Sequence, residues 1–213
     1  SDDAIDSDDA MQEFQRFRSE LITVRDVTLR VFSKGEGAPI VFLHAGQGLH
    51  GSAEALERLS EFGRVVIPAH PGFAGTSLPQ SITGVDDLAF LYLDLLEQLD
   101  LKDVILVGAS FGGWIAAEMA VIRSGLLSIK VTDRETRAIV DMHAMSEDDL
   151  AGLLYADPQK FRPNYATMSD EEVVDAARGR EAFAFLGWRP YMYSPKLRTR
   201  LHRIQVPALV LWG

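Results

Sequence analysis

The sequence predicts an α/β protein with a mainly parallel, doubly wound sheet and a helical insertion late in the chain. Three observations lead to this fold class. Apolar runs without alternation are typical of strands buried on both faces of a sheet. Amphipathic segments separate these runs, and the order strand then helix occurs three times, which predicts right-handed crossovers with helices on both faces. After residue 124 the pattern changes and becomes largely helical.

The first part of the chain predicts an arm and a hairpin. Residues 1–10 include five Asp, and we expect them to form a solvated arm. Residues 11–17 predict a short amphipathic helix. The β-rich runs 21–24 and 27–32 are separated by Arg25-Asp26 only, so an antiparallel hairpin is expected.

Three buried strands and three helices then alternate. In chain order the expected elements are strand 39–43, helix 53–62, strand 64–68, helix 85–99, strand 103–107 and helix 112–123. In the first of these helices the apolar stripe consists of Ala55, Leu56, Leu59 and Phe62.

The late part of the chain predicts a cap over this core. Residues 133–200 contain no clear buried strand, and buried-strand character returns at 206–213. The insertion is rich in aromatic residues, namely Tyr155, Phe161, Tyr165, Phe183, Phe185, Trp188, Tyr191 and Tyr193. They either fill a small core of the insertion itself or line a ligand site, and both interpretations stay open. The expected division is an arm with a short helix (1–19), a core (20–132), a cap (133–200) and a returning core strand (201–213).

The composition excludes several classes of protein. The 213 residues carry 21 Lys+Arg against 31 Asp+Glu, a net charge of −10, which argues against a nucleic-acid partner. The absence of Cys excludes disulfides, thiolate zinc sites and a cysteine nucleophile. No apolar run is long enough to span a membrane, and the acidic start does not resemble a secretory signal. We therefore expect a protein of the cytoplasm without membrane partner, metal or cofactor, and a homo-oligomer is compatible with the sequence.

The strongest chemical signal is the string Gly108-Ala109-Ser110-Phe111-Gly112. It lies directly between a predicted strand and a predicted helix, which is the setting in which a nucleophilic serine sits on a sharp turn above a sheet. Side chains at the two glycine positions are expected to collide with neighbouring backbone. The alternative is that Ser110 merely caps the following helix.

Four segments in this order resemble landmarks of the α/β-hydrolase superfamily. They are VFLHAG at 41–46, PAHPGFAGTS at 68–77, GASFGG at 108–113 and VPALVLWG at 206–213. The resemblance implies an α/β-hydrolase fold whose insertion is the family's helical cap. With serine at position 110, the chain resembles the esterases, lipases, peptidases and carbon–carbon bond hydrolases of that family, which carry serine at the nucleophile position.

The resemblance also implies an oxyanion hole made by two backbone N–H groups. One is expected from Gly46 or its neighbour Ala45, and the other from Phe111. The alternative is that 45–48 is only a strand-ending turn. His44 and His70 are expected to hold loops by hydrogen bonds rather than to touch substrate.

The family's acid and histidine are expected after the strand at 206–213, beyond Gly213. A second departure is the short passage from helix to strand near 124–130, so the sequence suggests the ordered part of a longer protein or a truncated one. If the chain is complete, Asp133 is the best substitute acid, with His143 or His202 as base.

These observations predict a serine hydrolase that cleaves an ester or similar carbonyl-linked bond of a small, apolar molecule through an acyl-enzyme. Ser110, Phe111 and Gly46 are the expected site residues. The alternatives are a non-catalytic binding protein of the same fold, a truncated inactive hydrolase, and an interaction fragment whose last strand is open to pairing.

Overall fold

The structure is a computed structural model that describes residues 12–123, 127–132, 145–154, 157–161, 164–188 and 192–211. The predicted acidic arm, the substitute acid Asp133 and His143 lie outside these residues.

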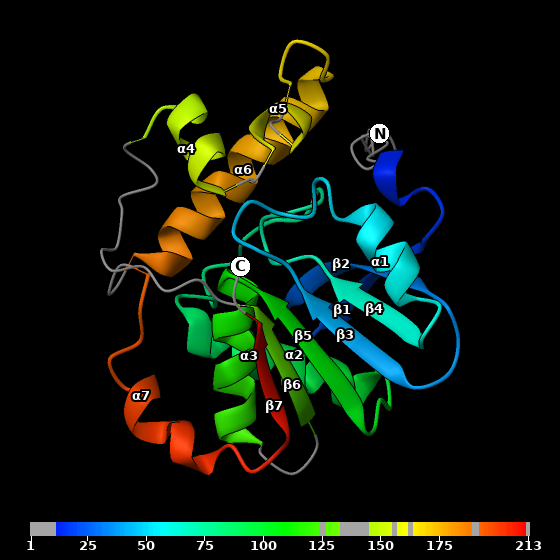
Figure 1. Ribbon diagram of the computed structural model, residues 1–213, viewed down its shortest axis with the longest axis vertical. Coiled ribbons are helices and arrows are strands. Elements are labelled where there is room, and N and C mark those ends of the chain that lie inside the picture. The colour runs from blue at the N-terminus through cyan, green and yellow to red at the C-terminus, as the bar shows by residue number, and fades with distance from the viewer. Residues whose placement is uncertain are drawn as a thin grey trace.

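A seven-stranded sheet forms the centre of the described chain (Figure 1). Its spatial order is β1-β2-β4-β3-β5-β6-β7. The strands are β1 (Arg18–Val24), β2 (Val27–Lys34), β3 (Pro39–Leu43), β4 (Arg64–Pro68), β5 (Val104–Ala109), β6 (Leu127–Thr132) and β7 (Ala208–Leu211). Strands β1 and β2 form the predicted antiparallel hairpin, β2 pairs antiparallel with β4, and every pairing from β4 through β7 is parallel. The predicted fold class is confirmed.

Helices cover both faces of this sheet, as a doubly wound order requires. The core helices are α1 (Ala53–Leu59), α2 (Val85–Gln98) and α3 (Phe111–Ile122). The chain moves from β3 to β4 in one direction along the sheet and from β4 to β5 in the other. Right-handed crossovers therefore place α1 on one face and α2 and α3 on the opposite face, where α2 packs against α3.

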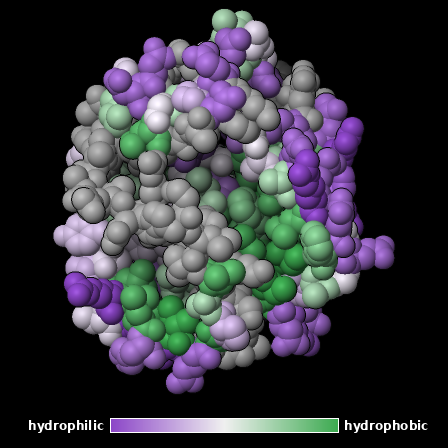
Figure 2. Space-filling view, in the orientation of Figure 1, coloured by the Kyte–Doolittle hydropathy of each residue, from purple (hydrophilic) through white to green (hydrophobic). Residues whose placement is uncertain are grey.

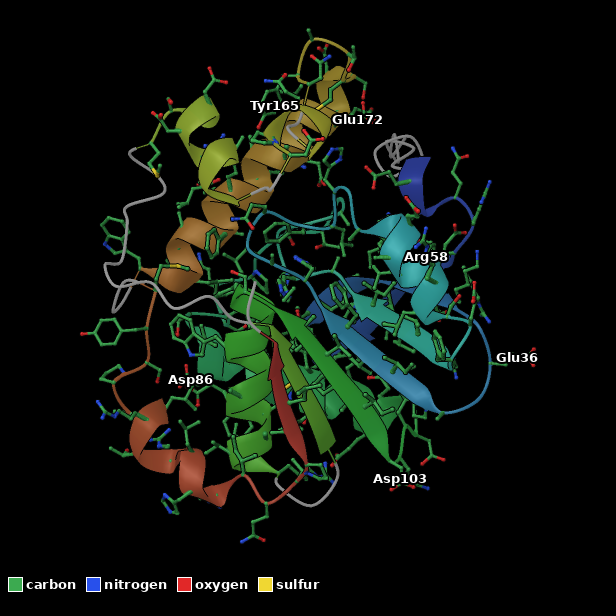
Figure 3. All side chains as sticks on the ribbon, viewed as in Figure 1. Glu36, Arg58, Asp86, Asp103, Tyr165 and Glu172 are labelled. Carbon is green, nitrogen blue, oxygen red and sulfur yellow. The ribbon has the colours of Figure 1, made fainter. Side chains whose placement is uncertain are left out.

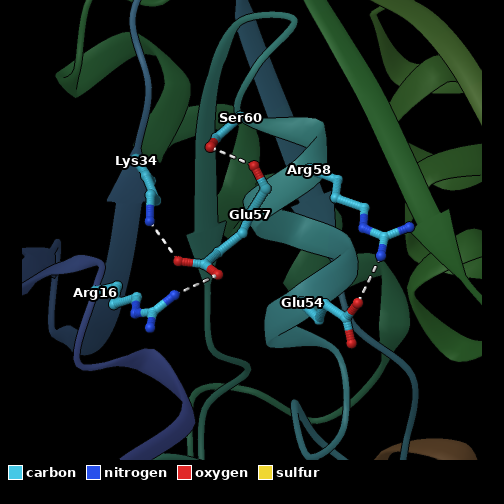
Figure 4. A network of polar contacts seen from close by, with 6 residues as sticks. All are labelled: Arg16, Lys34, Glu54, Glu57, Arg58 and Ser60. Carbon is cyan, nitrogen blue, oxygen red and sulfur yellow. Dashed lines mark hydrogen bonds and ion pairs between the residues drawn. The ribbon is translucent and has the colours of Figure 1, made fainter.

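Two predicted helices are shorter than the sequence suggested. Helix α1 ends at Leu59, and Phe62 is 80% exposed instead of completing the apolar stripe. Ala55 is exposed as well. The helix stops because the chain turns at Ser60, whose hydroxyl donates to the Glu57 carbonyl at 2.6 Å (Figure 4).

At the start of the described chain, only the short 3₁₀ turn η1 (Gln12–Phe14) forms where a helix over 11–17 was expected. The ring of Phe14 lies 5.0 Å from that of Phe17 and 4.9 Å from that of Phe32, measured between centroids. Both Phe14 and Phe17 are buried, so packing on the sheet takes precedence over helical hydrogen bonding there.

Ion pairs fasten α1 to the hairpin and to the segment before it. The Glu57 carboxylate lies 2.5 Å from Lys34 Nζ of β2 and 3.5 Å from Arg16 Nη1, and Figure 4 shows both contacts. Glu54 and Arg58 form a further pair one turn apart at 2.7 Å. Because these groups are largely solvent-exposed, they orient α1 more than they stabilise it.

The predicted cap region is helical in its described residues. It contains α4 (Glu147–Leu154), α5 (Pro158–Phe161), α6 (Asp170–Gly187) and α7 (Leu197–Arg200), followed by the 3₁₀ turn η2 (Leu201–Arg203) and β7. Helix α6 begins with a capping box. Ser169 Oγ accepts from the Glu172 N–H at 3.3 Å, and the Glu172 carboxylate accepts from the Ser169 N–H at 2.7 Å.

Figure 1 shows α6 lying across the carboxyl ends of the core strands. Hydrophilic side chains gather at the top of the same view, over the cap (Figure 2). The buried residues of α6 are Gly179, Ala182, Phe183, Leu186 and Gly187, which lie at helical spacing and form its core-facing side.

Candidate active site

The candidate site lies where β3 and β5 end side by side. Leu43, the last residue of β3, is paired in register with Gly108 of β5. Glu36 and Asp103, which precede these two strands, lie at the opposite edge of the sheet from α6 (Figure 3). The loop after β3 and the turn after β5 are therefore neighbours at one edge, beneath α6.

Ser110 forms the sharp turn between β5 and α3. Its backbone has φ +50° and ψ −113°, a left-handed conformation that is unusual for a residue with a side chain. Its side chain makes no cap hydrogen bond to α3, and the residue is exposed. The structure therefore contradicts the alternative in which Ser110 merely caps the helix. Backbone strain of this kind costs about 1–3 kcal/mol and tends to occur at functional sites.

The two glycines of the motif have the steric purpose that the sequence predicts. A Cβ on Gly108 would lie 2.5 Å from the Gly112 carbonyl oxygen. A Cβ on Gly112 would lie only 2.0 Å from the Leu43 carbonyl oxygen. Because both obstacles are backbone atoms, they have little freedom to move, and only glycine allows α3 to start this close to β3.

The loop after β3 is a tight turn, closed by a hydrogen bond from the Gly48 N–H to the Ala45 carbonyl at 3.0 Å. Its Gly46 N–H has no acceptor among the residues that the structure describes. Phe111 opens α3, so its N–H has no partner inside the helix. Within the described part of the chain, these two N–H groups have no acceptor and belong to residues at the same edge of the sheet as Ser110. Their use as an oxyanion hole stays a prediction.

Two buried histidines hold this loop from behind. His44 donates from Nδ1 to the Ala45 carbonyl at 2.7 Å, and its Nε2 accepts the His70 backbone N–H at 2.9 Å. His70 donates from Nε2 to the His44 carbonyl at 2.9 Å, and its Nδ1 accepts the Tyr92 hydroxyl. The two rings stack with centroids 3.6 Å apart. The prediction that His44 and His70 hold loops is confirmed.

Burial keeps all three groups of this network neutral. Desolvation lowers the pKa of His44 to about 4 and holds the pKa of His70 well below its usual range, where the neighbouring His44 lowers it further. Desolvation also raises the pKa of Tyr92. Since every ring nitrogen of the two histidines is already bonded, neither is free to take a proton from Ser110.

Of the other histidines, the structure describes His50 and His202, and neither supplies a base at this site. His50 Nδ1 pairs with the Glu13 carboxylate at 2.9 Å. His202 lies on η2, which precedes the start of β7, and β7 runs parallel to β6. His202 is therefore at the sheet edge opposite to Ser110. The catalytic use of His202 that the sequence allowed for a complete chain does not fit this placement.

Helix α6 packs directly on the loop after β3 and on the loop after β4. A Cβ on Gly46 would lie 2.4 Å from the Phe183 ring, and a Cβ on Gly72 would lie 2.5 Å from Ala182 Cβ. Asp175 accepts the Gly75 N–H at 2.6 Å. Sequence reasoning missed these contacts, although the spacing of small and apolar residues along α6 could have indicated a face packed on the core.

The aromatic side chains of the cap that the structure describes differ in burial. Phe183 is buried, but it packs on the core of the protein, against Gly46 and Phe111. Phe185, Trp188 and Tyr193 are each about half exposed. Tyr165 is partly exposed, and Figure 3 places it high in the cap. Tyr155, Tyr191 and the side chain of Phe161 lie outside the description. Among the described side chains, the half exposure of Phe185, Trp188 and Tyr193 and the packing of Phe183 on Phe111 count against the interpretation that the aromatics fill a core of the insertion's own.

No group of three or more His, Asp or Glu side chains in the described ranges lies close enough together to hold a metal ion. Among the helices of the same ranges, none combines the length and apolar character needed to cross a membrane.

Comparisons with known proteins agree with the fold. Residues 40–213 match the model of the Alpha/beta hydrolase family. The chain therefore belongs to the α/β-hydrolase family, as its four sequence landmarks predict.

Among curated proteins, the chain is 42% identical over 97 residues to a protein of Mycobacterium phage D29 named as a non-heme haloperoxidase. It is 35% identical over 92 residues to the 2-hydroxy-6-oxo-2,4-heptadienoate hydrolase of Pseudomonas putida. These alignments cover 42% and 41% of the chain but only 33% of each relative. The chain thus matches about a third of the length of these relatives.

Among solved structures, a bromoperoxidase from Bacillus anthracis superposes with a TM-score of 0.68 at 18% identity. The match covers 92% of the chain and 81% of the bromoperoxidase. At this identity the likeness concerns the fold, and it extends through nearly all of the chain.

Proposed function

We propose that the protein is a serine hydrolase that cleaves an ester or a similar carbonyl-linked bond of a small, apolar molecule through an acyl-enzyme. The observation that carries the proposal is the strained turn at Ser110, whose exposed hydroxyl does not serve the helix. A backbone kept in this conformation is costly, and presentation of a nucleophile accounts for it.

In the proposed reaction, Ser110 Oγ attacks the substrate carbonyl carbon and loses its proton to a histidine. The carbonyl oxygen becomes an oxyanion, which accepts hydrogen bonds from the N–H groups of Gly46 and Phe111. Collapse of this intermediate transfers the proton to the leaving oxygen and leaves the acyl group on Ser110. Water then attacks the ester, and the carboxylic acid is released while the serine is regenerated.

The histidine and its acid are expected after Gly213, where the family resemblance places them. This expectation is supported by the geometry of the described histidines. His44 and His70 are fully bonded, His50 pairs with Glu13, and His202 lies at the far edge of the sheet.

Hydrolysis of a carbon–carbon bond is a second candidate. It is favoured by the 35% identity to the 2-hydroxy-6-oxo-2,4-heptadienoate hydrolase, whose name describes a hydrolase of a dienoate. The same serine and the same two N–H groups serve both reactions, because each develops negative charge on a carbonyl oxygen.

The test is covalent labelling of the purified full-length protein with a fluorophosphonate, followed by peptide mass spectrometry. We expect one adduct, on Ser110. Ser110→Ala should abolish the adduct, whereas Ser81→Ala should retain it, because Ser81 is an exposed serine bonded to Asp26 and not to the site. Short-chain nitrophenyl esters and one diketo-acid substrate, assayed in parallel, separate the two candidate reactions.

Absence of the adduct together with absence of turnover on either substrate class would favour a non-catalytic binding protein. In that case Ser110→Ala should leave ligand binding unchanged.

A further inference from the structure

The cap helix α6 reaches the proposed oxyanion hole through one side chain. The ring of Phe183 covers Gly46 so closely that a Cβ on this glycine would lie 2.4–2.5 Å from three of the ring carbons. The same ring meets that of Phe111 edge to face, with centroids 5.1 Å apart and planes at 67°. Phe183 thus contacts both residues whose N–H groups form the proposed hole.

The position of the Gly46 loop depends on such outside contacts. Gly46 has no side chain with which to anchor itself, and His44 and His70 hold the loop from the core side only. On the cap side, all three of the nearest atoms around a Cβ at Gly46 belong to Phe183. Phe183 is itself 5% exposed, so its ring has little room to move.

Helix α6 in turn is fixed to the core by its own contacts. Asp175 accepts the Gly75 N–H, and Gly179 lies against Phe73 so closely that a Cβ there would approach the ring to 2.6 Å. The placement of the helix therefore determines where the Phe183 ring lies. A shift of α6 is transmitted to Gly46 and Phe111 through this ring.

We propose that Phe183 is a positioning residue that couples the cap helix α6 to the oxyanion hole. The inference rests on the proposed function. Two N–H groups stabilise an oxyanion only when both lie about 2.7–3.1 Å from the same oxygen, so a small displacement of one donor reduces the turnover number. The cap on this chain sets the rate of the chemical step and does more than admit substrate.

The test compares three single substitutions on α6. Phe183→Leu keeps an apolar side chain but removes the ring that touches Gly46 and Phe111. Leu186→Ala removes packing from another buried position of the helix, and Phe185→Ala truncates a ring that is about half exposed. All variants are made in the full-length protein, and kcat and KM are measured separately on a short-chain nitrophenyl ester.

We expect Phe183→Leu to lower kcat about 10-fold or more while KM changes less than about 2-fold, because the lost interaction acts in the transition state. Affinity for a trifluoromethyl ketone, which forms a tetrahedral adduct, should fall in parallel with kcat. Affinity for the product acid should stay unchanged. Phe185→Ala should resemble the wild type, and Leu186→Ala should lower stability more than kcat.

Equal losses of kcat in Phe183→Leu and Leu186→Ala, or a change confined to KM, would overturn the coupling and leave the serine hydrolase intact. Wild-type protein without adduct or turnover would overturn both. Hydrogen exchange adds a readout that does not need activity. The Gly48 amide, whose bond to the Ala45 carbonyl closes the turn around Gly46, should exchange faster in Phe183→Leu than in Leu186→Ala, and equal rates would count against the coupling.

Discussion

The buried histidine pair predicts a specific loss of stability in mild acid. In the folded protein the pKa of His44 is lowered from its ordinary value of 6.5 to about 4, because burial disfavours the charged ring. The unfolded chain therefore binds a proton at pH 5 that the folded chain does not bind. The burial of neutral His44 therefore costs no stability above pH 6.5. Below that pH the free energy of unfolding falls, until the pH reaches the folded pKa of about 4.

The magnitude follows from the two pKa values. Between pH 7 and pH 5, the proton taken up by the unfolded chain at His44 lowers the free energy of unfolding by about 2 kcal/mol. His70 acts in the same direction, since its pKa is also lowered by burial. His50 acts in the opposite direction because its bond to Glu13 raises its pKa. A comparison of variants is therefore needed to isolate His44.

The assay is urea unfolding of wild type and His44→Asn at pH 7, 6 and 5, followed by far-UV circular dichroism. Asparagine offers a donor and an acceptor but does not titrate. The variant should be less stable than wild type at pH 7, and the gap should narrow by about 2 kcal/mol on going to pH 5. A gap that stays constant across this range would refute the account of His44 as a neutral, buried loop anchor.

Three further predictions concern other parts of the chain. Glu13→Gln removes the carboxylate that raises the pKa of His50. The stability that protonated His50 contributes is lost as the pH rises through its raised folded pKa. The stability that ionised Glu13 contributes is lost as the pH falls through its lowered folded pKa. The difference in melting temperature from wild type should thus be largest between pH 4.5 and 6.5, the ordinary values of the two groups. Gly112→Ala should destabilise the protein by more than about 2 kcal/mol in urea, because its Cβ meets backbone. Gly152→Ala is the matched control, since no atom of the described residues lies within 4 Å of an added Cβ, and it should stabilise α4 by about 0.5–1 kcal/mol. Ser169→Ala removes the capping box and should weaken α6 by about 1 kcal/mol, visible as faster amide exchange in its first turn.

The sequence was sufficient for the order of the elements because strands β3 and β4 are largely buried on both faces. Their continuous apolar runs show no helical periodicity that would favour another assignment. The structure has strands at 39–43 and 64–68 as expected. Helix ends were harder to predict because they depend on local contacts. The hydroxyl of Ser60 turns the chain and leaves Phe62 exposed, although Phe62 has the right spacing for the stripe.

The site was predictable only where it is made of one continuous segment. The motif from Gly108 to Gly112 fixes its own geometry, since Gly108 allows α3 to lie close to β5 and Gly112 allows it to lie close to β3. The contact between Phe183 and Gly46 joins residues far apart in the chain, so the helical spacing that places Phe183 and not Phe185 on the apolar side of α6 does not identify its partner. Only the packing of α6 on the core decides which of the two rings is buried.

The left-handed backbone at Ser110 has a consequence for how such a protein can change over generations. At φ +50° a glycine carries no steric penalty, whereas any residue with a side chain does. Stability alone would favour replacement of the serine, so a hydroxyl is kept at this turn only while selection acts on what it does. Where that selection is absent, a substitution of Ser110 by glycine would stabilise the fold and remove the nucleophilic hydroxyl at the same time.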